Sequence, residues 1–290
     1  MALLHLDFES IYMGCNQDVN IIVPDAPRDV SPKEFYSAKK KYKVLWLLHG
    51  TFGGYSDWIR KSNIETYACE RELIVVMPGV GNTDYEAWNN FTLGLDAEKY
   101  IMEELFSLVH NWLPASEKRE DNYVAGLSMG GGGALKLALR YPEHFAACAS
   151  LSCVPADPSL NKEELEKLFA MKRSEVDVPG DVMHSRLRRY NIMHRYDSVE
   201  EYLSSPSNLY GLIMDNMGKE NLPRLFFSTG TEDPLMKDAF VEMKKKFMEN
   251  GWKAEWVEGP GSHEWRVWER DIQKALDFFG MENEEKGNAF

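Results

Sequence analysis

A glycine-rich corner between an apolar run and a helical stretch constrains the fold of this chain more than any other feature. The run "DNYVAGLS" ends at Ser128 and predicts a buried strand, and residues 129–140 after it have helical spacing. Four consecutive glycines, residues 130–133, open that helix, although each glycine costs roughly 1 kcal/mol relative to alanine. The pattern "GLSMG" therefore predicts a sharp strand-turn-helix corner, with Ser128 at its tip and glycines where side chains would collide.

Apolar runs and helical stretches alternate along most of the chain. The run "KVLWLLHG", residues 43–50, is typical of a strand that is buried on both faces of a parallel sheet. The last six of eight such runs alternate with helical stretches, which predicts a mostly parallel sheet with helices on both faces. In such sheets the active site lies beyond the carboxyl ends of the strands. The eight expected strands are "LLHLDFESIYM", "DVNIIVP", "KVLWLLHG", "LIVVMPGVG", "DNYVAGLS", "FAACASLSCV", "RLFFSTG" and "KAEWVEG".

Two segments carry more specific expectations about surface and core. Residues 25–41 are polar and contain a run of three lysines, so a surface loop is expected there. Residues 96–113 have helical spacing with an apolar face. The residues expected near that face are Tyr100, Ile101, Leu105, Leu108 and Trp112.

Residues 154–222 break the alternation. They are charged and rich in Met and Tyr, and they hold short helical pieces such as "NKEELEKLFAMK" and "SVEEYLSS" but no buried strand. We therefore expect one domain over residues 1–290, in which residues 154–222 form an insertion that caps Ser128.

Composition excludes several classes of protein. Of the 290 residues 44% are hydrophobic, which suits a globular protein with a large core. A formal charge of −13 would repel phosphate backbones, so no nucleic-acid partner is expected. No signal peptide, membrane span, metal cluster or dinucleotide fingerprint is visible, and the four cysteines show no C-x-x-C spacing. The expectation is a cytoplasmic protein without membrane partner, metal or cofactor, and a homo-oligomer is left open.

A serine at the tip of such a corner can act as a nucleophile. Its hydroxyl is a poor nucleophile unless a base accepts its proton and an acid orients that base. In a strand-turn-helix corner of this kind the partners follow in the order Ser, Asp or Glu, His, each after a later strand. Of seven histidines, His263 in "GPGSHEW" directly follows the last strand and precedes the last helix. His263 is therefore predicted to be the base.

The acid is expected in "GTEDPL", which follows the penultimate strand. Either Glu232 or Asp233 could orient the imidazole, and Asp233 is preferred because it closes the loop before Pro234, where a helix is expected to start. An aspartate in that place could also cap the helix.

Acyl transfer also needs hydrogen-bond donors for the developing oxyanion. One is expected to be the backbone N–H of Met129, at the start of the helix after Ser128. The second is expected from the loop after "KVLWLLHG", which continues as "TFGGYSDW". Thr51 is preferred for this role, and Phe52 is the alternative.

The combined motifs resemble those of the putative-esterase, or esterase D-like, branch of the α/β-hydrolases. The matching pieces are "LLHGTFGGYSDW", "GLSMGGGGAL", "GTEDPL" and "GSHEWRVW", in family order, and the resemblance spans about residues 3–280. It implies an α/β-hydrolase fold with Ser128 as nucleophile, Asp233 and His263 as its partners, and Thr51 and Met129 as oxyanion donors. The opening "MALLHLDFES" is most similar to bacterial tributyrin-type short-chain esterases.

The leading hypothesis is a serine carboxylesterase that hydrolyses short acyl esters, such as acetyl or butyryl esters of small molecules. A carbohydrate esterase for acetyl-xylan or feruloyl groups and an S-formylglutathione hydrolase are the alternatives. Trp58, Tyr85, Trp88 and Trp265 could stack on the rings of such substrates, although buried core is the common fate of aromatic residues. A non-catalytic binding module is disfavoured, because all three residues of the expected site are present.

Overall fold

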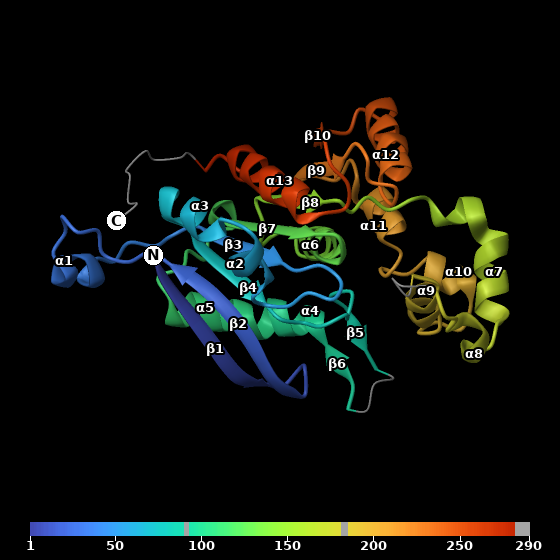
Figure 1. Ribbon diagram of the computed structural model, residues 1–290, viewed down its shortest axis with the longest axis horizontal. Coiled ribbons are helices and arrows are strands. Elements are labelled where there is room, and N and C mark those ends of the chain that lie inside the picture. The colour runs from blue at the N-terminus through green and yellow to red at the C-terminus, as the bar shows by residue number, and fades with distance from the viewer. Residues whose placement is uncertain (90–92, 181–184, 282–290) are drawn as a thin grey trace. The chain divides into compact units, whose positions relative to one another are not determined.

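The computed structural model, which describes residues 1–89, 93–180 and 185–281, forms two compact units. The first unit combines Met1–Val154 with Lys219–Phe290, and the second consists of Pro155–Gly218. The second unit lies within the segment that was expected to be an insertion. Figure 1 shows the sheet and its helices in the first unit and the helical second unit.

An eight-stranded sheet forms the centre of the first unit, with the strand order β1-β2-β4-β3-β7-β8-β9-β10. β1 pairs antiparallel with β2, and β2 pairs antiparallel with β4, whereas all other neighbours are parallel. The eight expected strands and the mostly parallel sheet are therefore confirmed. The strands are β1 (Ala2–Ser10), β2 (Cys15–Val23), β3 (Val44–Leu48), β4 (Ile74–Pro78), β7 (Asn122–Leu127), β8 (Ala147–Leu151), β9 (Arg224–Gly230) and β10 (Glu255–Gly259). A small separate hairpin, β5 (Ala87–Trp88) and β6 (Leu95–Asp96), was not expected.

Helices cover both faces of the sheet (Figure 1). Neighbouring strand residues point to opposite faces, and Phe226 and Phe227 of β9 illustrate this. Phe226 contacts Phe278 at 5.6 Å between ring centroids, and Phe227 contacts Phe247 at 5.9 Å. The helices of this unit are α1 (Pro32–Ser37), α2 (Asp57–Lys61), α3 (Ile64–Glu70), α4 (Ala97–Lys99), α5 (Phe106–Trp112), α6 (Met129–Arg140), α12 (Lys237–Glu249) and α13 (Trp265–Phe278). Because both faces are covered, β3, β4, β7 and β8 are buried at every position.

Two local expectations were wrong in part. Residues 25–41 do not form a loop throughout, because α1 lies within them, although none of its residues is buried. The apolar face of the helix that follows β6 changes its register at a π-helical turn, Tyr100–Leu105. A π turn inserts an extra residue into the helical repeat. Tyr100, Ile101 and Leu105 are fully buried as expected, but after this turn Val109 is fully buried, whereas Trp112 is 71% exposed.

The second unit is helical and has a small apolar core of its own. It contains α7 (Lys162–Ala170), α8 (Arg173–Val176), α9 (Ser185–Met193), α10 (Val199–Leu203) and α11 (Leu209–Asn216). The described residues of this unit include no strand, as expected from their sequence. Its core consists of Leu165, Leu168, Val176, Met193 and Val199.

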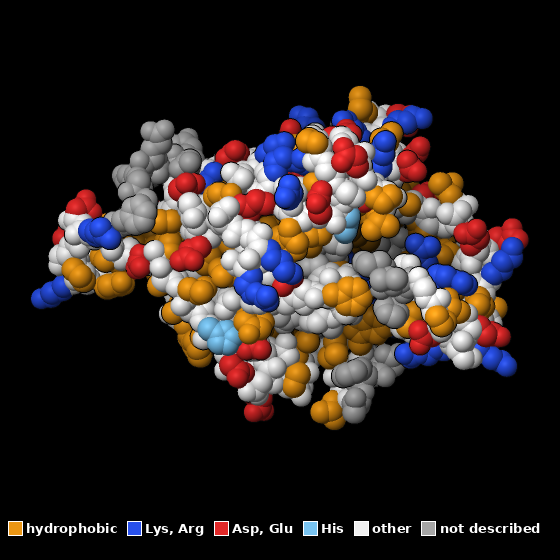
Figure 2. Space-filling model, viewed as in Figure 1, with side chains coloured by type: hydrophobic (Ala, Val, Ile, Leu, Met, Phe, Trp, Pro, Cys, Tyr) orange, Lys and Arg blue, Asp and Glu red, His pale blue; other side chains and the backbone are white. Residues whose placement is uncertain are grey.

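Charged side chains of both signs are interspersed on the face that Figure 2 shows, which fits the mixed but net acidic composition. Among the described residues no helix combines the length and the apolar character that crossing a bilayer requires.

Candidate active site

Ser128 lies in a strained turn between β7 and α6. Its backbone angles are φ 51° and ψ −119°, a conformation that non-glycine residues rarely adopt and that clusters at functional sites. Its N–H donates to the carbonyl of Leu151 at 2.8 Å, which fixes the turn against the end of β8. A side chain at Gly126 would collide with the backbone of Gly130, and one at Gly130 with the carbonyls of Leu48 and His49. The turn therefore requires glycine at both positions.

The glycines that follow make room for neighbouring segments. A Cβ atom at Gly131 would lie 2.8 Å from Ser150 Oγ and 2.9 Å from Cys153 Cβ, and one at Gly133 would overlap the ring of Tyr85. Every residue of α6 from Met129 to Leu139 is buried. The helix is therefore enclosed on all sides rather than amphipathic, which explains why the chain accepts residues of low helix propensity there.

The imidazole of His263 lies within hydrogen-bonding distance of both Ser128 and Asp233. The Nε2 atom of His263 is 2.9 Å from Ser128 Oγ, and its Nδ1 atom is 2.8 Å from Asp233 Oδ2. Because an ionised carboxylate only accepts hydrogen bonds, Nδ1 carries the proton and Nε2 is left to accept from the serine hydroxyl. The Asp233 side chain is fully buried and that of His263 is 15% exposed. The arrangement can withdraw a proton from the serine hydroxyl.

Asp233, rather than Glu232, points at the imidazole of His263. Its second oxygen, Oδ1, accepts from the N–H of Leu235 at 2.9 Å, whereas Glu232 is exposed. The expected helix start at Pro234 was wrong, because α12 begins at Lys237 with Met236 as its N-cap. Asp233 therefore does not cap that helix, and its carboxylate oxygens are held by a turn and by His263.

The loops that carry the acid and the base are joined by backbone hydrogen bonds. Thr231 N–H donates to the carbonyl of Gly259 at 2.8 Å, and Glu232 N–H donates to that of Gly261 at 3.0 Å. On the helix side, the guanidinium of Arg270 donates to the carbonyl of Pro260 at 2.7 Å. These contacts fix the separation between the two loops and hence the distance between Asp233 and His263.

The loop after β3 begins with a buried, neutral histidine. His49 Nδ1 lies 2.8 Å from the carbonyl of Gly50, and its Nε2 accepts from the N–H of Val80 at 3.2 Å. Since a carbonyl only accepts, the proton lies on Nδ1. Burial lowers the pKa of His49, an effect that the hydrogen bond to Gly50 partly offsets. The loop is therefore tied to the segment after β4 by an uncharged ring.

One of the two alternatives for the second oxyanion donor, Phe52, is hydrogen-bonded within the protein. The N–H of Phe52 donates to Asn82 Oδ1 at 2.8 Å, so this amide is engaged by a side chain of the neighbouring loop. Phe52 has φ 61°, and its side chain is 62% exposed. The Phe52 N–H is therefore occupied by Asn82, and the choice between Thr51 and Phe52 stays a prediction.

Two of the four aromatic residues expected to contact substrate are core residues. Trp58 is 1% exposed and donates through Nε1 to the carbonyl of Leu48 at 3.1 Å. Tyr85 is fully buried and donates through its hydroxyl to the carbonyl of His49 at 2.8 Å. Neither ring has a face for a substrate, so the prediction of substrate stacking was wrong for both.

Trp88 and Trp265, the other two aromatic candidates, are half-buried. Trp88 donates through Nε1 to the carbonyl of Thr83 at 2.7 Å. Trp265 packs edge to face on Trp58 and on Trp268, at 5.2 Å and 5.4 Å between ring centroids. Their contact with substrate stays a prediction.

Within the described ranges, no three His, Cys, Asp or Glu side chains converge in a way that could hold a metal ion. The four cysteines are free thiols, and Cys148 is buried. Proton transfer and backbone dipoles are the chemistry that the described residues near Ser128 offer.

Residues 10–279 match the model of the family described as "Putative esterase". The chain belongs to this family. An acetyl esterase from Caldicellulosiruptor saccharolyticus is 25% identical over 291 residues, a match that covers 96% of this chain and 98% of the relative. This family and the similar serine-hydrolase structures described next make this chain a serine carboxylic-ester hydrolase.

Solved structures agree with the family assignment. An S-formylglutathione hydrolase (FrmB) from Staphylococcus aureus is similar with a TM-score of 0.74 and 26% identity, over 96% of this chain and 98% of that one. A substrate-bound fluorophosphonate-binding serine hydrolase, FphF, from the same organism gives a TM-score of 0.73 with the same identity and coverage. Together with the sheet topology, these likenesses establish the α/β-hydrolase fold.

Proposed function

We propose that Ser128, His263 and Asp233 are the catalytic triad of this esterase. The main support is the position of the His263 imidazole, whose Nε2 lies 2.9 Å from Ser128 Oγ and whose Nδ1 lies 2.8 Å from Asp233 Oδ2. A serine hydroxyl is a weak nucleophile until an adjacent base takes its proton. The strained backbone of Ser128 supports the same assignment, since it holds the hydroxyl at the tip of the turn.

Acylation begins when Ser128 Oγ attacks the carbonyl carbon of the ester and His263 Nε2 accepts the hydroxyl proton. Asp233 stabilises the imidazolium that forms and holds its Nδ1–H in place. The tetrahedral intermediate then expels the alcohol, which leaves with the proton from Nε2. The product of this half-reaction is an ester between the acyl group and Ser128.

Deacylation repeats the same steps with water as the nucleophile. His263 Nε2 takes a proton from water as the oxygen attacks the acyl carbonyl, and then returns a proton to Ser128 Oγ as the acid leaves. In both intermediates the N–H groups of Met129 and Thr51 are proposed to bind the oxyanion, a contribution of about 3 kcal/mol for one donor.

The substrates are proposed to be short acyl esters, acetyl esters foremost. The end-to-end likeness to an acetyl esterase supports this choice.

We also propose, from the sequence alone, that residues 154–222 cover Ser128 and line the acyl pocket. The free cysteines support action in a reducing compartment such as the cytoplasm, and a homo-oligomer is an open alternative to a monomer.

S-formylglutathione hydrolysis is the second candidate. It is favoured by the likeness to an enzyme of that name, at 26% identity over nearly the whole of both chains. The same triad would attack a formyl thioester, with the glutathione thiol as leaving group. Feruloyl esters are a third option, and a solved ferulic acid esterase that is 19% identical shares the fold, with a TM-score of 0.63.

A substrate panel separates these possibilities. We expect kcat/KM to be highest for p-nitrophenyl acetate and butyrate and to fall at octanoate, with weaker activity on methyl ferulate. Acetylated xylo-oligosaccharides and S-formylglutathione complete the panel. A kcat/KM for S-formylglutathione far above that for every oxygen ester would replace the proposal with the second candidate.

A further inference from the structure

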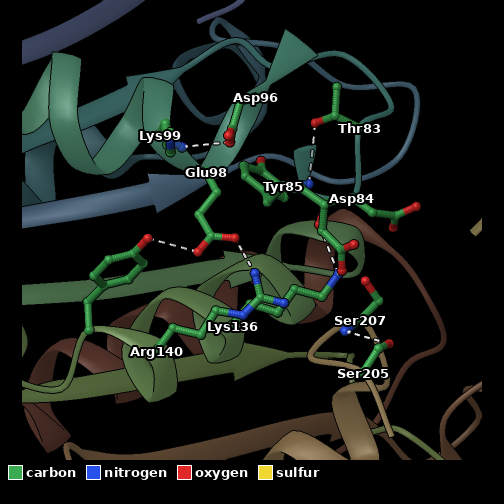
Figure 3. A network of polar contacts seen from close by, with 12 residues as sticks. Thr83, Asp84, Tyr85, Asp96, Glu98, Lys99, Lys136, Arg140, Ser205 and Ser207 are labelled. Atoms are coloured by element: carbon green, nitrogen blue, oxygen red, sulfur yellow. Dashed lines mark hydrogen bonds and ion pairs between the residues drawn. The ribbon is translucent and has the colours of Figure 1, made fainter. Parts of the chain in front are cut away.

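Lys136 is a buried lysine on the helix that follows Ser128. Its side chain is 8% exposed and forms an ion pair with Glu86, which is 1% exposed. The ammonium group also donates to the carbonyl of Asp84 at 3.0 Å (Figure 3). Taking two charges out of water costs several kcal/mol per ion, so a buried pair is weak evidence for stability by itself. The stability of the fold alone therefore does not account for this pair.

The partners of Lys136 belong to the segment after β4, residues 79–86, which we call the clamp loop. This loop makes three hydrogen bonds to the loop after β3. Val80 N–H donates to His49 Nε2 at 3.2 Å, and the hydroxyl of Tyr85 donates to the carbonyl of His49 at 2.8 Å. Asn82 Oδ1 accepts from Phe52 N–H at 2.8 Å. Gly50 and Thr51 lie between the anchored residues His49 and Phe52.

The clamp loop is held in a conformation that the chain disfavours. Asp84 and Tyr85 both have φ 57°, in the left-handed region. Each such residue costs on the order of 1–3 kcal/mol and persists only where its surroundings determine it. Lys136 binds at this kink, to the carbonyl of Asp84 within it and to the carboxylate of Glu86 directly after it. The ring of Tyr85 also fills the space left by Gly133 of the same helix.

α6 is thus linked to both proposed oxyanion donors, to one directly and to the other through the clamp loop. Its first residue is Met129, which supplies one N–H directly, and Lys136 reaches the other donor through the clamp loop. We propose that Lys136 is a positioning residue that fixes the Thr51 N–H relative to the Met129 N–H. This inference rests on the proposed triad and oxyanion hole, and it assigns to Lys136 no contact with substrate.

The chain offers a matched control on the same helix. Arg140 forms an ion pair with Glu98, and their side chains are 17% and 16% exposed (Figure 3). This pair joins α6 to α4, and neither Arg140 nor Glu98 belongs to the clamp loop. Replacing both charges of a pair by apolar residues avoids leaving one charge buried and alone. The test therefore compares Lys136→Met/Glu86→Leu with Arg140→Met/Glu98→Leu.

The readout is the binding of a trifluoromethyl ketone, which adds to Ser128 and places an oxyanion in the hole. In Lys136→Met/Glu86→Leu we expect kcat for p-nitrophenyl acetate to fall about 10- to 100-fold, less than the loss of a whole donor. We expect the inhibitor to bind more weakly by a similar factor, with KM within about twofold, because only the oxyanion depends on this geometry. In the control, Arg140→Met/Glu98→Leu, we expect kcat, KM and inhibitor affinity each to stay within about twofold of the original values.

The isosteric Glu86→Gln keeps the shape of the pair and should show a smaller loss in the same direction. If the double variant does not fold, Glu86→Gln alone tests the positioning role of Lys136. Unchanged kcat and inhibitor binding in Glu86→Gln or in the folded double variant would overturn the inference, as would an equal loss in the control. Activity that persists in Ser128→Ala would instead overturn the proposed triad, so the two failures are distinguishable.

Discussion

His263 Nε2 lies 2.9 Å from Ser128 Oγ, although the two residues are 135 positions apart in the chain. The contact exists because β7 and β10 belong to the same parallel part of the sheet, so that the loops after their carboxyl ends meet at one edge. The partner of His263 on its other side, Asp233, follows β9, which lies next to β10.

Asp233→Asn should lower kcat by on the order of 10²–10⁴-fold, because an amide does not fix the Nδ1–H tautomer of His263 and cannot stabilise the imidazolium. Steady-state hydrolysis of p-nitrophenyl acetate measures this. Glu232→Gln is the matched control, since Glu232 is adjacent in sequence but exposed. A larger loss in Glu232→Gln than in Asp233→Asn would assign the acid to Glu232.

Gly133→Ala should destabilise the protein by about 1–3 kcal/mol, since the added methyl group would overlap the buried ring of Tyr85. Urea unfolding followed by circular dichroism measures the change. Gly54→Ala is the control, because a methyl group there meets no atom within 4 Å. Equal stability of the two variants would contradict the close packing of Tyr85 against α6.

The stability of the protein should depend on His49 below neutral pH. Burial lowers the pKa of His49 in the folded state, so below about pH 6.5 the unfolded chain binds a proton that the folded chain does not. The free energy of unfolding therefore falls as the pH decreases, by at most about 1.4 kcal/mol per pH unit from this group.

Urea unfolding at pH 7 and pH 5 tests this contribution. We expect His49→Gln to lose less stability between the two pH values than the unchanged protein does. A pH dependence that is identical in the two proteins would show that His49 is protonated equally in both states.

Val109→Ala should cost about 1–3 kcal/mol, because it removes two buried methyl groups and leaves a cavity, whereas Trp112→Ala should be nearly neutral. Val109 is fully buried and Trp112 is 71% exposed, as the π-helical turn before them dictates. Thermal unfolding of the two variants measures the difference. The opposite order of stabilities would restore the uninterrupted helical register expected from the sequence.

The arrangement of Ser128, Asp233 and His263 was accessible from the sequence for a topological reason. Each residue follows an apolar run that reads as a strand, and parallel strands bring their carboxyl ends to one edge. The glycines at 126 and 130 added a local signal, since few other turns exclude side chains at both positions. These features depend on short segments and on strand order, both of which the sequence pattern carries.

Features that depend on a distant partner were not accessible. Trp58 and Tyr85 were candidates for stacking on substrate because nothing in their local sequence reveals that they donate to the carbonyls of Leu48 and His49. The π-helical turn likewise leaves no pattern in the sequence. Lys136 did offer a signal, since it is the one charged residue among Met129–Leu139 of a buried helix.

The central claim is that Ser128 is the nucleophile, and the hydrolysis of p-nitrophenyl acetate by Ser128→Ala tests it most directly. Ser152→Ala is the matched control, because Ser152 is a buried serine with φ 49° directly after the neighbouring strand, β8. We expect kcat/KM to fall by on the order of 10⁴–10⁶-fold in Ser128→Ala and to stay near the original value in Ser152→Ala. Activity of a folded Ser128→Ala protein close to that of the unchanged enzyme would contradict the claim.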